Sequence, residues 1–213
     1  MKPTIAVCLM TCDRDGYTRR TIDSFLEQNP DRSRFVLLHG DDASKDQKNH
    51  RLARAAGFRT VVQHQVRCGI LATRIAMIQA AANFAPWVLV LENDQESIRP
   101  FPWELFDFVA RNKKIYCLRL FGEFKDAARR DRCKVTHQWK RHRLVKWYPL
   151  EGAPEKSQFG AIHWSAQPTV TRVISAIAIH CKHKRDVGLT ARVLNNVMVH
   201  IGEERTAAEP VAC

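Results

Sequence analysis

WVLVLEND, residues 87–94, places an unbroken apolar run directly before a cluster of acidic and amide side chains. Apolar residues without alternation are typical of a strand that is buried on both faces of a sheet. The same order occurs twice earlier in the chain: residues 4–10 precede the polar stretch TCDRDGY, and residues 35–38 precede HGDDAS. The sequence therefore predicts three buried strands, each ending in polar side chains.

Helical patterns separate these apolar runs. Apolar residues around Ile22 share one helical face as far as Pro30, and further helices are expected at residues 48–56 and at about residues 71–83. The β-branched run at residues 60–62 predicts another strand. Alternating helices and apolar strands favour an α/β fold with a mainly parallel central sheet flanked by helices. Such sheets bind ligands at the carboxyl ends of their strands, where the polar clusters lie.

The second half of the chain has a less regular pattern. We expect a helix at residues 103–111, a strand at 115–120, a last helix at about 170–179 and an apolar segment at 193–201. The tail at 206–213 is expected to be loose. All 213 residues fit one domain, because single hydrophobic cores grow to roughly 250 residues before chains divide.

Composition excludes several classes of protein. With 45% apolar and 26% charged residues, the chain is neither collagen-like nor wholly disordered. No apolar run reaches the roughly 18 residues of a membrane span, and residues 5–10 are too few for a signal-peptide core, so we expect a cytoplasmic protein. The seven cysteines include no C-x-x-C pair and no spacing that matches a histidine cluster. We therefore expect neither a disulfide framework nor a zinc finger.

Three motifs resemble one known family in their order and spacing: TCDR at residues 11–14, DDAS at 41–44 and LEND at 91–94. Together they are similar to the nucleotide-sugar half of GT-A fold glycosyltransferases, particularly the family 2-like enzymes. The resemblance covers about half of the chain. It implies a single GT-A (Rossmann-like) domain, with a nucleotide-sugar-binding half at residues 1–105 and an acceptor-binding half at residues 106–205.

The resemblance also implies which residues bind the donor. Asp41 or Asp42 would contact the nucleotide base, and Thr11 and Arg14 would lie against the nucleotide. Family members have an arginine similar to Arg74 near the diphosphate or the metal loop. The donor is expected to be a nucleotide-diphosphate sugar, most simply a UDP-sugar.

An acidic D-x-D signature after the fourth strand holds a divalent metal on the diphosphate in this family. The resemblance implies that Asp94 binds the metal, and that His200 is the late-chain histidine that often adds a further ligand. The chain departs from the signature at Glu92 and Asn93, which are grouped here with the nucleotide-sugar-binding residues. Carboxylate oxygens suit hard cations, so the expected cofactor is Mn²⁺ or Mg²⁺, which neutralises charge on the departing diphosphate.

The nearest match to the acidic base of inverting family members is Asp186, which would activate the acceptor hydroxyl. Basic neighbours would lower the pKa of Asp186, and a surface salt bridge is the alternative role. Glu151 and Glu155 are rival bases.

Structural roles are alternatives to these functional ones. They are a turn and helix N-cap for Asp41, Asp42 and Ser44, a solvated loop for Glu92, Asn93, Asp94 and Glu96, and a mutual ion pair for Asp13 and Arg14. For Arg74, a surface ion pair is the alternative to orienting the Asp94 loop. For His200, the alternative is a purely structural role.

Net charge indicates a polyanionic partner. The chain has 34 basic and 22 acidic side chains, a formal net charge of +12. Residues 125–146 alone contain nine Lys or Arg against two Asp, and aromatic residues are interleaved with and follow the basic ones. This composition suits phosphate contact and base stacking, although a solvated basic loop is an alternative. The expected acceptor-binding residues are Arg129, Arg130, Lys140 and Arg141.

The resemblance and the charge together predict a metal-dependent glycosyltransferase (EC 2.4) that transfers a sugar from a nucleotide-diphosphate sugar to an acceptor hydroxyl. The favoured acceptor is hydroxymethylated DNA, as in phage enzymes that act in the host cytoplasm. A cell-surface glycan or a lipid is an alternative acceptor, and a non-catalytic nucleic-acid-binding module is an alternative function. A nucleotidyltransferase is disfavoured because TCDRDGY lacks a Gly-rich basic signature.

Overall fold

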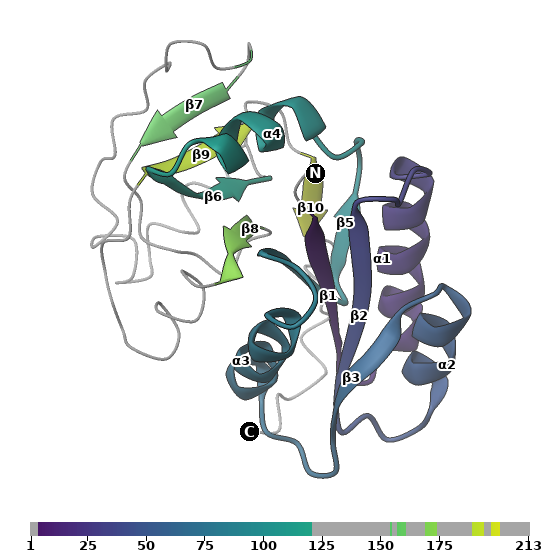
Figure 1. Ribbon diagram of the computed structural model, residues 1–213. Helices are drawn as coiled ribbons and strands as arrows, with labels where there is room; N and C mark the ends of the chain where they lie inside the picture. The colour runs from purple at the N-terminus through teal and green to yellow at the C-terminus, as the bar shows by residue number, and fades with distance from the viewer. Residues whose placement is uncertain are drawn as a thin grey trace, which may run out of the picture.

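The computed structural model of the chain describes residues 4–120, 154, 157–160, 169–173, 189–193 and 197–200. An eight-stranded sheet in the order β3-β2-β1-β4-β8-β6-β9-β7 runs through these residues (Figure 1). A separate two-stranded sheet pairs β10 with β5.

The first half of the large sheet is parallel. β1 (Ile5–Thr11) pairs with β2 (Phe35–Asp42) on one side and with β4 (Trp87–Glu92) on the other, and β3 (Arg59–His64) follows β2 at the edge. These strands coincide with the apolar and β-branched runs that the sequence predicts. The predicted fold class, an α/β fold with a mainly parallel central sheet flanked by helices, is confirmed.

The second half of the sheet is mixed. β8 (Thr169–Arg172) lies antiparallel between β4 and β6 (Ile115–Arg119), and so joins the two halves. β6 pairs parallel with β9 (Leu189–Val193), which pairs antiparallel with the edge strand β7 (Ser157–Gly160). The helix expected at about residues 170–179 is wrong at its start, where the chain is extended. The β-branched residues of this segment favour a strand, and both neighbours of β8 satisfy its backbone.

The small sheet brings the end of the described chain to the polar cluster after β4. β5 (Gln95–Ser97) pairs antiparallel with β10 (Met198–His200), and His200 lies opposite Gln95 in the register. The apolar segment expected at residues 193–201 therefore ends in a strand. This pairing places the backbone of His200 one residue away from Asp94.

Helices cover both faces of the parallel half (Figure 1). They are α1 (Asp15–Gln28), α2 (Lys48–Ala55), α3 (Ile70–Ala81) and α4 (Trp103–Arg111). Val7 and the other odd-numbered core residues of β1 share a hydrophobic cluster with α1, α2 and α4, whereas Cys8 and its even-numbered neighbours share one with α3. Burial on both faces explains the unbroken apolar strands. None of the helices in the described part of the chain is long and apolar enough to cross a membrane.

Candidate functional site

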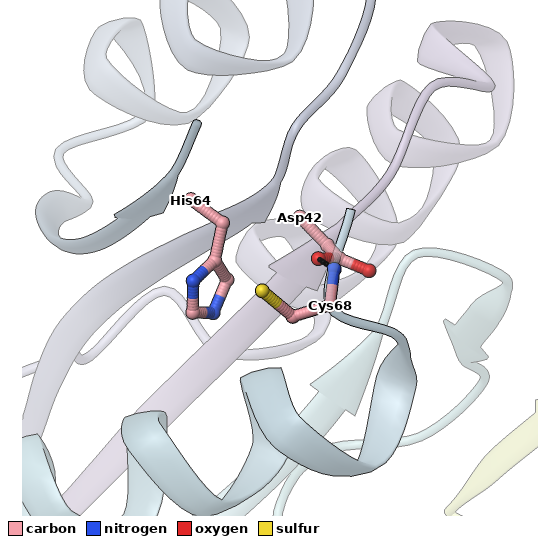
Figure 2. A group of neighbouring side chains, drawn as sticks. All are labelled: Asp42, His64 and Cys68. Carbon is pink, nitrogen blue, oxygen red and sulfur yellow. Dashed lines mark hydrogen bonds between the residues drawn. The ribbon is translucent and has the colours of Figure 1, made fainter. Parts of the chain in front are cut away.

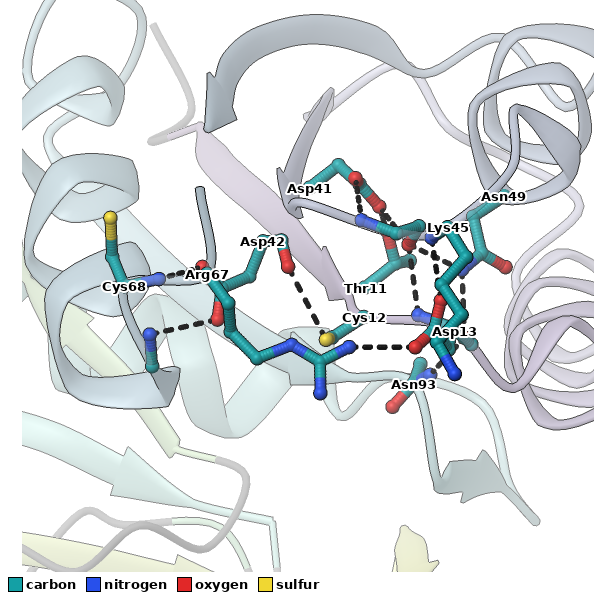
Figure 3. Close-up of polar contacts among 12 residues, drawn as sticks. Thr11, Cys12, Asp13, Asp41, Asp42, Lys45, Asn49, Arg67, Cys68 and Asn93 are labelled. Carbon is teal, nitrogen blue, oxygen red and sulfur yellow. Dashed lines mark hydrogen bonds and ion pairs between the residues drawn. The ribbon is translucent and has the colours of Figure 1, made fainter. Parts of the chain in front are cut away.

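Polar residues from four loops meet at the carboxyl edge of the parallel strands (Figure 3). The loop after β1 contacts the other three through Asp13. Its carboxylate accepts hydrogen bonds from the Lys45 amide at 2.7 Å and from Nη2 of Arg67 at 2.6 Å. Its carbonyl oxygen accepts one from Nδ2 of Asn93 at 3.2 Å. Asp13 thus pairs with Arg67, and the alternative of a mutual ion pair between Asp13 and Arg14 is wrong.

The charge state of Asp13 fits this linking role. Partial burial raises the pKa of Asp13, but the hydrogen bonds from Lys45 and Arg67 and the positive charges of both residues outweigh burial and hold the pKa below its usual value. An ionised Asp13 accepts stronger hydrogen bonds than a neutral one. Deprotonation therefore helps to hold the four loops together at neutral pH.

Backbone strain is concentrated in two of these loops. Asp13, Arg14 and Ala43 have φ angles of 51°, 59° and 53°, and they are the non-glycine residues with positive φ in the described part of the chain. Positive φ is costly for residues that carry a Cβ, and such strain clusters at functional sites, where surrounding contacts maintain it. The contacts of Asp13 supply that restraint here.

Asp41 is held by its neighbours in a buried turn. Its carboxylate accepts hydrogen bonds from the Thr11 hydroxyl at 2.7 Å, from the Ser44 amide at 2.8 Å and from the Ser44 hydroxyl at 2.6 Å. The turn interpretation of Asp41 and Ser44 therefore describes the geometry. Thr11 is also buried, and its hydroxyl donates to Asp41. Its expected contact with a nucleotide stays a prediction.

A chain of hydrogen bonds runs from Asp41 through His39 to His50 on α2. The Thr11 hydroxyl donates to Asp41, so the Nε2–H of His39 must donate to the Thr11 oxygen at 2.9 Å. Nδ1 of neutral His39 then accepts from the Thr60 hydroxyl at 3.1 Å, and Nδ1–H of His50 donates to the Thr60 oxygen at 3.2 Å. Burial lowers the pKa of His39 to about 4, which keeps the ring neutral at pH 7.

Asp42 organises the loop between β3 and α3. One carboxylate oxygen accepts a hydrogen bond from the Cys68 amide at 2.7 Å and the other accepts one from the Gly69 amide at 2.9 Å. The side chain is 4% exposed. Each carboxylate oxygen has a second lone pair, so Asp42 can still accept a hydrogen bond from a bound molecule.

Glu92 and Arg74 form a close ion pair between the end of β4 and α3. Arg74 is 6% exposed, so the alternative of a surface ion pair is wrong. Arg74 contacts Glu92, two residues before Asp94, and so supports the end of the strand from which the Asp94 loop begins. Its charge offsets that of Glu92, which reduces the suitability of Glu92 as a metal ligand.

Asn93 and Asp94 connect the β4 loop to the β1 loop. Nδ2 of Asn93 donates to the Asp13 carbonyl at 3.2 Å and contacts the Thr18 hydroxyl at 3.4 Å. Asp94 is 5% exposed, and one of its carboxylate oxygens lies 3.5 Å from Nη1 of Arg14. The solvated-loop alternative is wrong for Asp94, which is buried, whereas Glu92, Asn93 and Glu96 are partly exposed.

Several predicted functional residues lie outside the described residues. They are the proposed base Asp186, its rivals Glu151 and Glu155, and the acceptor residues Arg129, Arg130, Lys140 and Arg141. For His200 the structure places the backbone, opposite Gln95 in the β5–β10 ladder. Its expected role at the metal therefore stays a prediction.

Sequence reasoning missed several polar residues that complete the edge. Asn49 donates from Nδ2 to the Asp13 carbonyl at 2.7 Å, and Arg67 pairs with Asp13. His64 and Cys68 lie beside Asp42, a grouping that the spacing of the cysteines and histidines in the sequence did not indicate (Figure 2). One feature of the sequence could have indicated this cluster. His64 ends a β-branched run and stands four residues before Cys68.

The comparisons with known proteins find a similarity of fold and no similarity of sequence to a known family. No protein-family model and no curated protein matches the chain. A mycobacterial protein of solved structure is similar over 99% of this chain and 69% of its own length, with 16% identity and a TM-score of 0.55. The mannosyltransferase PcManGT from Pyrobaculum calidifontis, solved with GDP-Man and Mn²⁺, aligns with 58% of this chain at 14% identity and a TM-score of 0.45. This chain spans 36% of the mannosyltransferase chain.

Proposed function

We propose that this chain is a metal-dependent glycosyltransferase that uses a nucleotide-diphosphate sugar. The observation that carries the proposal is the convergence of acidic side chains from β2 and β4 at one edge of a parallel sheet, where α/β folds bind ligands. Contacts through Asp13 hold both loops in place. A binding module that used the sheet only as a scaffold would have no use for this arrangement.

Asp42 is the residue that we assign to the nucleotide base. Three hydrogen bonds from Thr11 and Ser44 already engage Asp41, whereas Asp42 accepts two backbone N–H groups and retains acceptor capacity on both oxygens. Those two amides also fix the orientation of the carboxylate. A base that presents an N–H, as uracil does, would therefore meet a preoriented acceptor.

Asp94 and His200 are the residues that we assign to a Mn²⁺ or Mg²⁺ ion. The assignment is supported by Asp94, a buried carboxylate 3.5 Å from the Arg14 guanidinium, and by the register that pairs the backbone of His200 with Gln95, the residue after Asp94. When bound, such an ion neutralises charge that develops on the diphosphate leaving group. Arg14 adds a guanidinium that can contact the same phosphates.

The acceptor half of the proposal rests on charge. A net charge of +12, concentrated in residues 125–146, favours a polyanionic acceptor, and we propose hydroxymethylated DNA as that acceptor. Asp186 is our proposed base for its hydroxyl.

The test of the donor site is ligand-dependent thermal stability. UDP with Mn²⁺ should raise the melting temperature of the full chain more than either alone, because a ligand that binds only the folded state stabilises it. Asp42→Asn should weaken the nucleotide effect, whereas Asp23→Asn on the exposed face of α1 should preserve it. The proposal fails if UDP, GDP and dTDP each leave the wild-type melting temperature unchanged in the presence of Mn²⁺.

A further inference from the structure

A carboxylate, an imidazole and a thiol come together at the edge of β2 and β3. Asp42 and His64 are register partners at the ends of these two strands, so their side chains leave the same face of the sheet. This face is covered by α3, because a Cβ at Gly40, two residues before Asp42, would lie 2.4 Å from Sδ of Met77. Cys68 lies in the loop that leads from β3 into α3, next to the side chains of Asp42 and His64.

The potential ligand atoms of these three residues lie within 4.8 Å of one another (Figure 2). The hydrogen bonds from the Cys68 and Gly69 amides to Asp42 hold the loop over the strand ends. The Cys68 thiol is exposed and contacts the Val66 carbonyl at 3.2 Å, so it can rotate without disturbing the core. Backbone contacts therefore fix the cluster while one ligand keeps freedom to adjust.

His64 supplies a second, independent observation. Its Nε2 atom is buried and has no hydrogen-bond partner within the described part of the chain. A buried imidazole nitrogen without a partner costs free energy, because the hydrogen bonds that it makes with water are lost on folding. A metal ion bound by this ring would compensate for that loss.

We propose that Asp42, His64 and Cys68 bind a zinc ion, with the fourth coordination position open to water. Thiolate and imidazole ligands favour zinc over Mn²⁺ or Mg²⁺, which prefer oxygen, so the site differs from the one assigned to Asp94. Typical zinc–ligand bonds place neighbouring ligand atoms about 3.3–3.8 Å apart, so zinc would draw the three ligand atoms closer together, and the exposed Cys68 thiol has the most freedom to move. The nearby Arg67 guanidinium is paired with Asp13, which offsets its charge.

Zinc at this site would regulate the donor site. This consequence rests on the proposed function, in which Asp42 contacts the nucleotide base. A zinc ion on one Asp42 oxygen takes the remaining lone pair of that oxygen and withdraws electron density from the other, so the carboxylate becomes a weaker acceptor for a base N–H. Zinc and the nucleotide therefore compete for Asp42, and micromolar zinc should inhibit donor binding in the presence of excess Mn²⁺.

Cobalt substitution tests the zinc site without reference to activity. Co²⁺ added to the reduced full chain should give a thiolate-to-cobalt charge-transfer band that zinc abolishes by displacement. Cys68→Ser should remove this band, and His64→Gln should weaken cobalt binding by about tenfold or more. Cys12→Ser and His50→Gln are matched controls outside the cluster that should keep the band. The site is refuted if wild-type protein gives no band, or if Cys68→Ser retains it.

Nucleotide binding then separates the two proposals. Zinc should raise the Kd for UDP in wild-type protein but leave it unchanged in Cys68→Ser, whose backbone amide still donates to Asp42. A cobalt band with no UDP binding would refute the proposed donor site and leave the zinc site standing. A cobalt band with UDP binding that zinc does not affect would refute the competition alone.

Discussion

At the scale of single residues, Asp94 is expected to matter for catalysis rather than for folding. Asp94→Asn keeps the volume and removes the anionic ligand, so turnover with Mn²⁺ should fall by about 100-fold or more. Steady-state kinetics on the sugar donor would measure this loss, and circular dichroism would check the fold. Asp23→Asn is the control for a change of charge. Wild-type turnover that is as fast in EDTA as in Mn²⁺ would contradict the metal assignment.

His39 gives the free energy of unfolding a specific pH dependence. Its pKa is lowered by burial to about 4 in the folded protein, against an ordinary value of 6.5 for histidine. Between these values the unfolded chain binds the extra proton, so stability should fall as pH decreases from about 6.5 to 4, by up to about 3 kcal/mol. Above pH 6.5 this contribution is fully present. Urea denaturation across this range should show a shallower pH dependence for His39→Gln than for wild-type protein.

At the scale of elements, continuous apolar strands could be predicted and short strands could not. β1, β2 and β4 are buried on both faces, so each leaves an apolar run that is visible in the sequence. β5 and β8 have three and four residues, and their strand conformation depends on partners distant in the chain. Their local pattern is too short to separate a strand from a loop or a helix.

Packing between β2 and α3 leaves no room for a side chain at Gly40. A Cβ there would lie 2.4 Å from Sδ of Met77, which is fully buried. Gly40→Ala should therefore destabilise the fold by about 1–3 kcal/mol through overpacking. Gly16→Ala is the matched control, since a Cβ at Gly16 meets nothing within 4 Å and alanine favours the helix.

Denaturant unfolding of both variants would measure the difference. Shortening the neighbour in Gly40→Ala/Met77→Ala should cost less than the sum of the two single changes, because the smaller side chain removes the clash. Strict additivity in this double-mutant cycle would show that the two residues do not compete for space.

The candidate site could be predicted from the sequence in its location but not in its internal contacts. Strand ends after apolar runs identify the edge where Asp41, Asp42 and Asp94 gather. The pairing of Asp13 with Arg67 joins residues 54 positions apart, and the cluster around His64 depends on the register of β2 and β3. Neither contact has a periodic signal, because loops that close over a sheet are specified by tertiary packing.

At the scale of the whole molecule, the net charge of +12 makes binding to a polyanion sensitive to salt. Each phosphate that the protein neutralises releases condensed counterions, so log K should fall with log salt by about 0.7–0.9 per contact. The proposed DNA acceptor therefore predicts a steep slope. A glycan or neutral lipid acceptor predicts a shallow one.

Two variants of equal net charge separate a localised DNA site from the general effect of a basic protein. The first changes the four proposed acceptor residues, Arg129, Arg130, Lys140 and Arg141, to Gln. The second changes four exposed basic residues near the carboxyl ends of α2 and α4, at the edge of the sheet opposite the carboxyl ends of the parallel strands: Arg54, Arg111, Lys113 and Lys114.

The acceptor variant should reduce the salt slope by up to about 2.8–3.6 and raise the KM for DNA, because it removes up to four phosphate contacts. The control variant should keep most of the wild-type slope. Hydrolysis of the sugar donor by water needs only the donor and metal residues, so it should persist in both variants. Equal slopes for the two variants, or no DNA binding by wild-type protein at low salt, would reject DNA as the acceptor and favour a glycan or lipid.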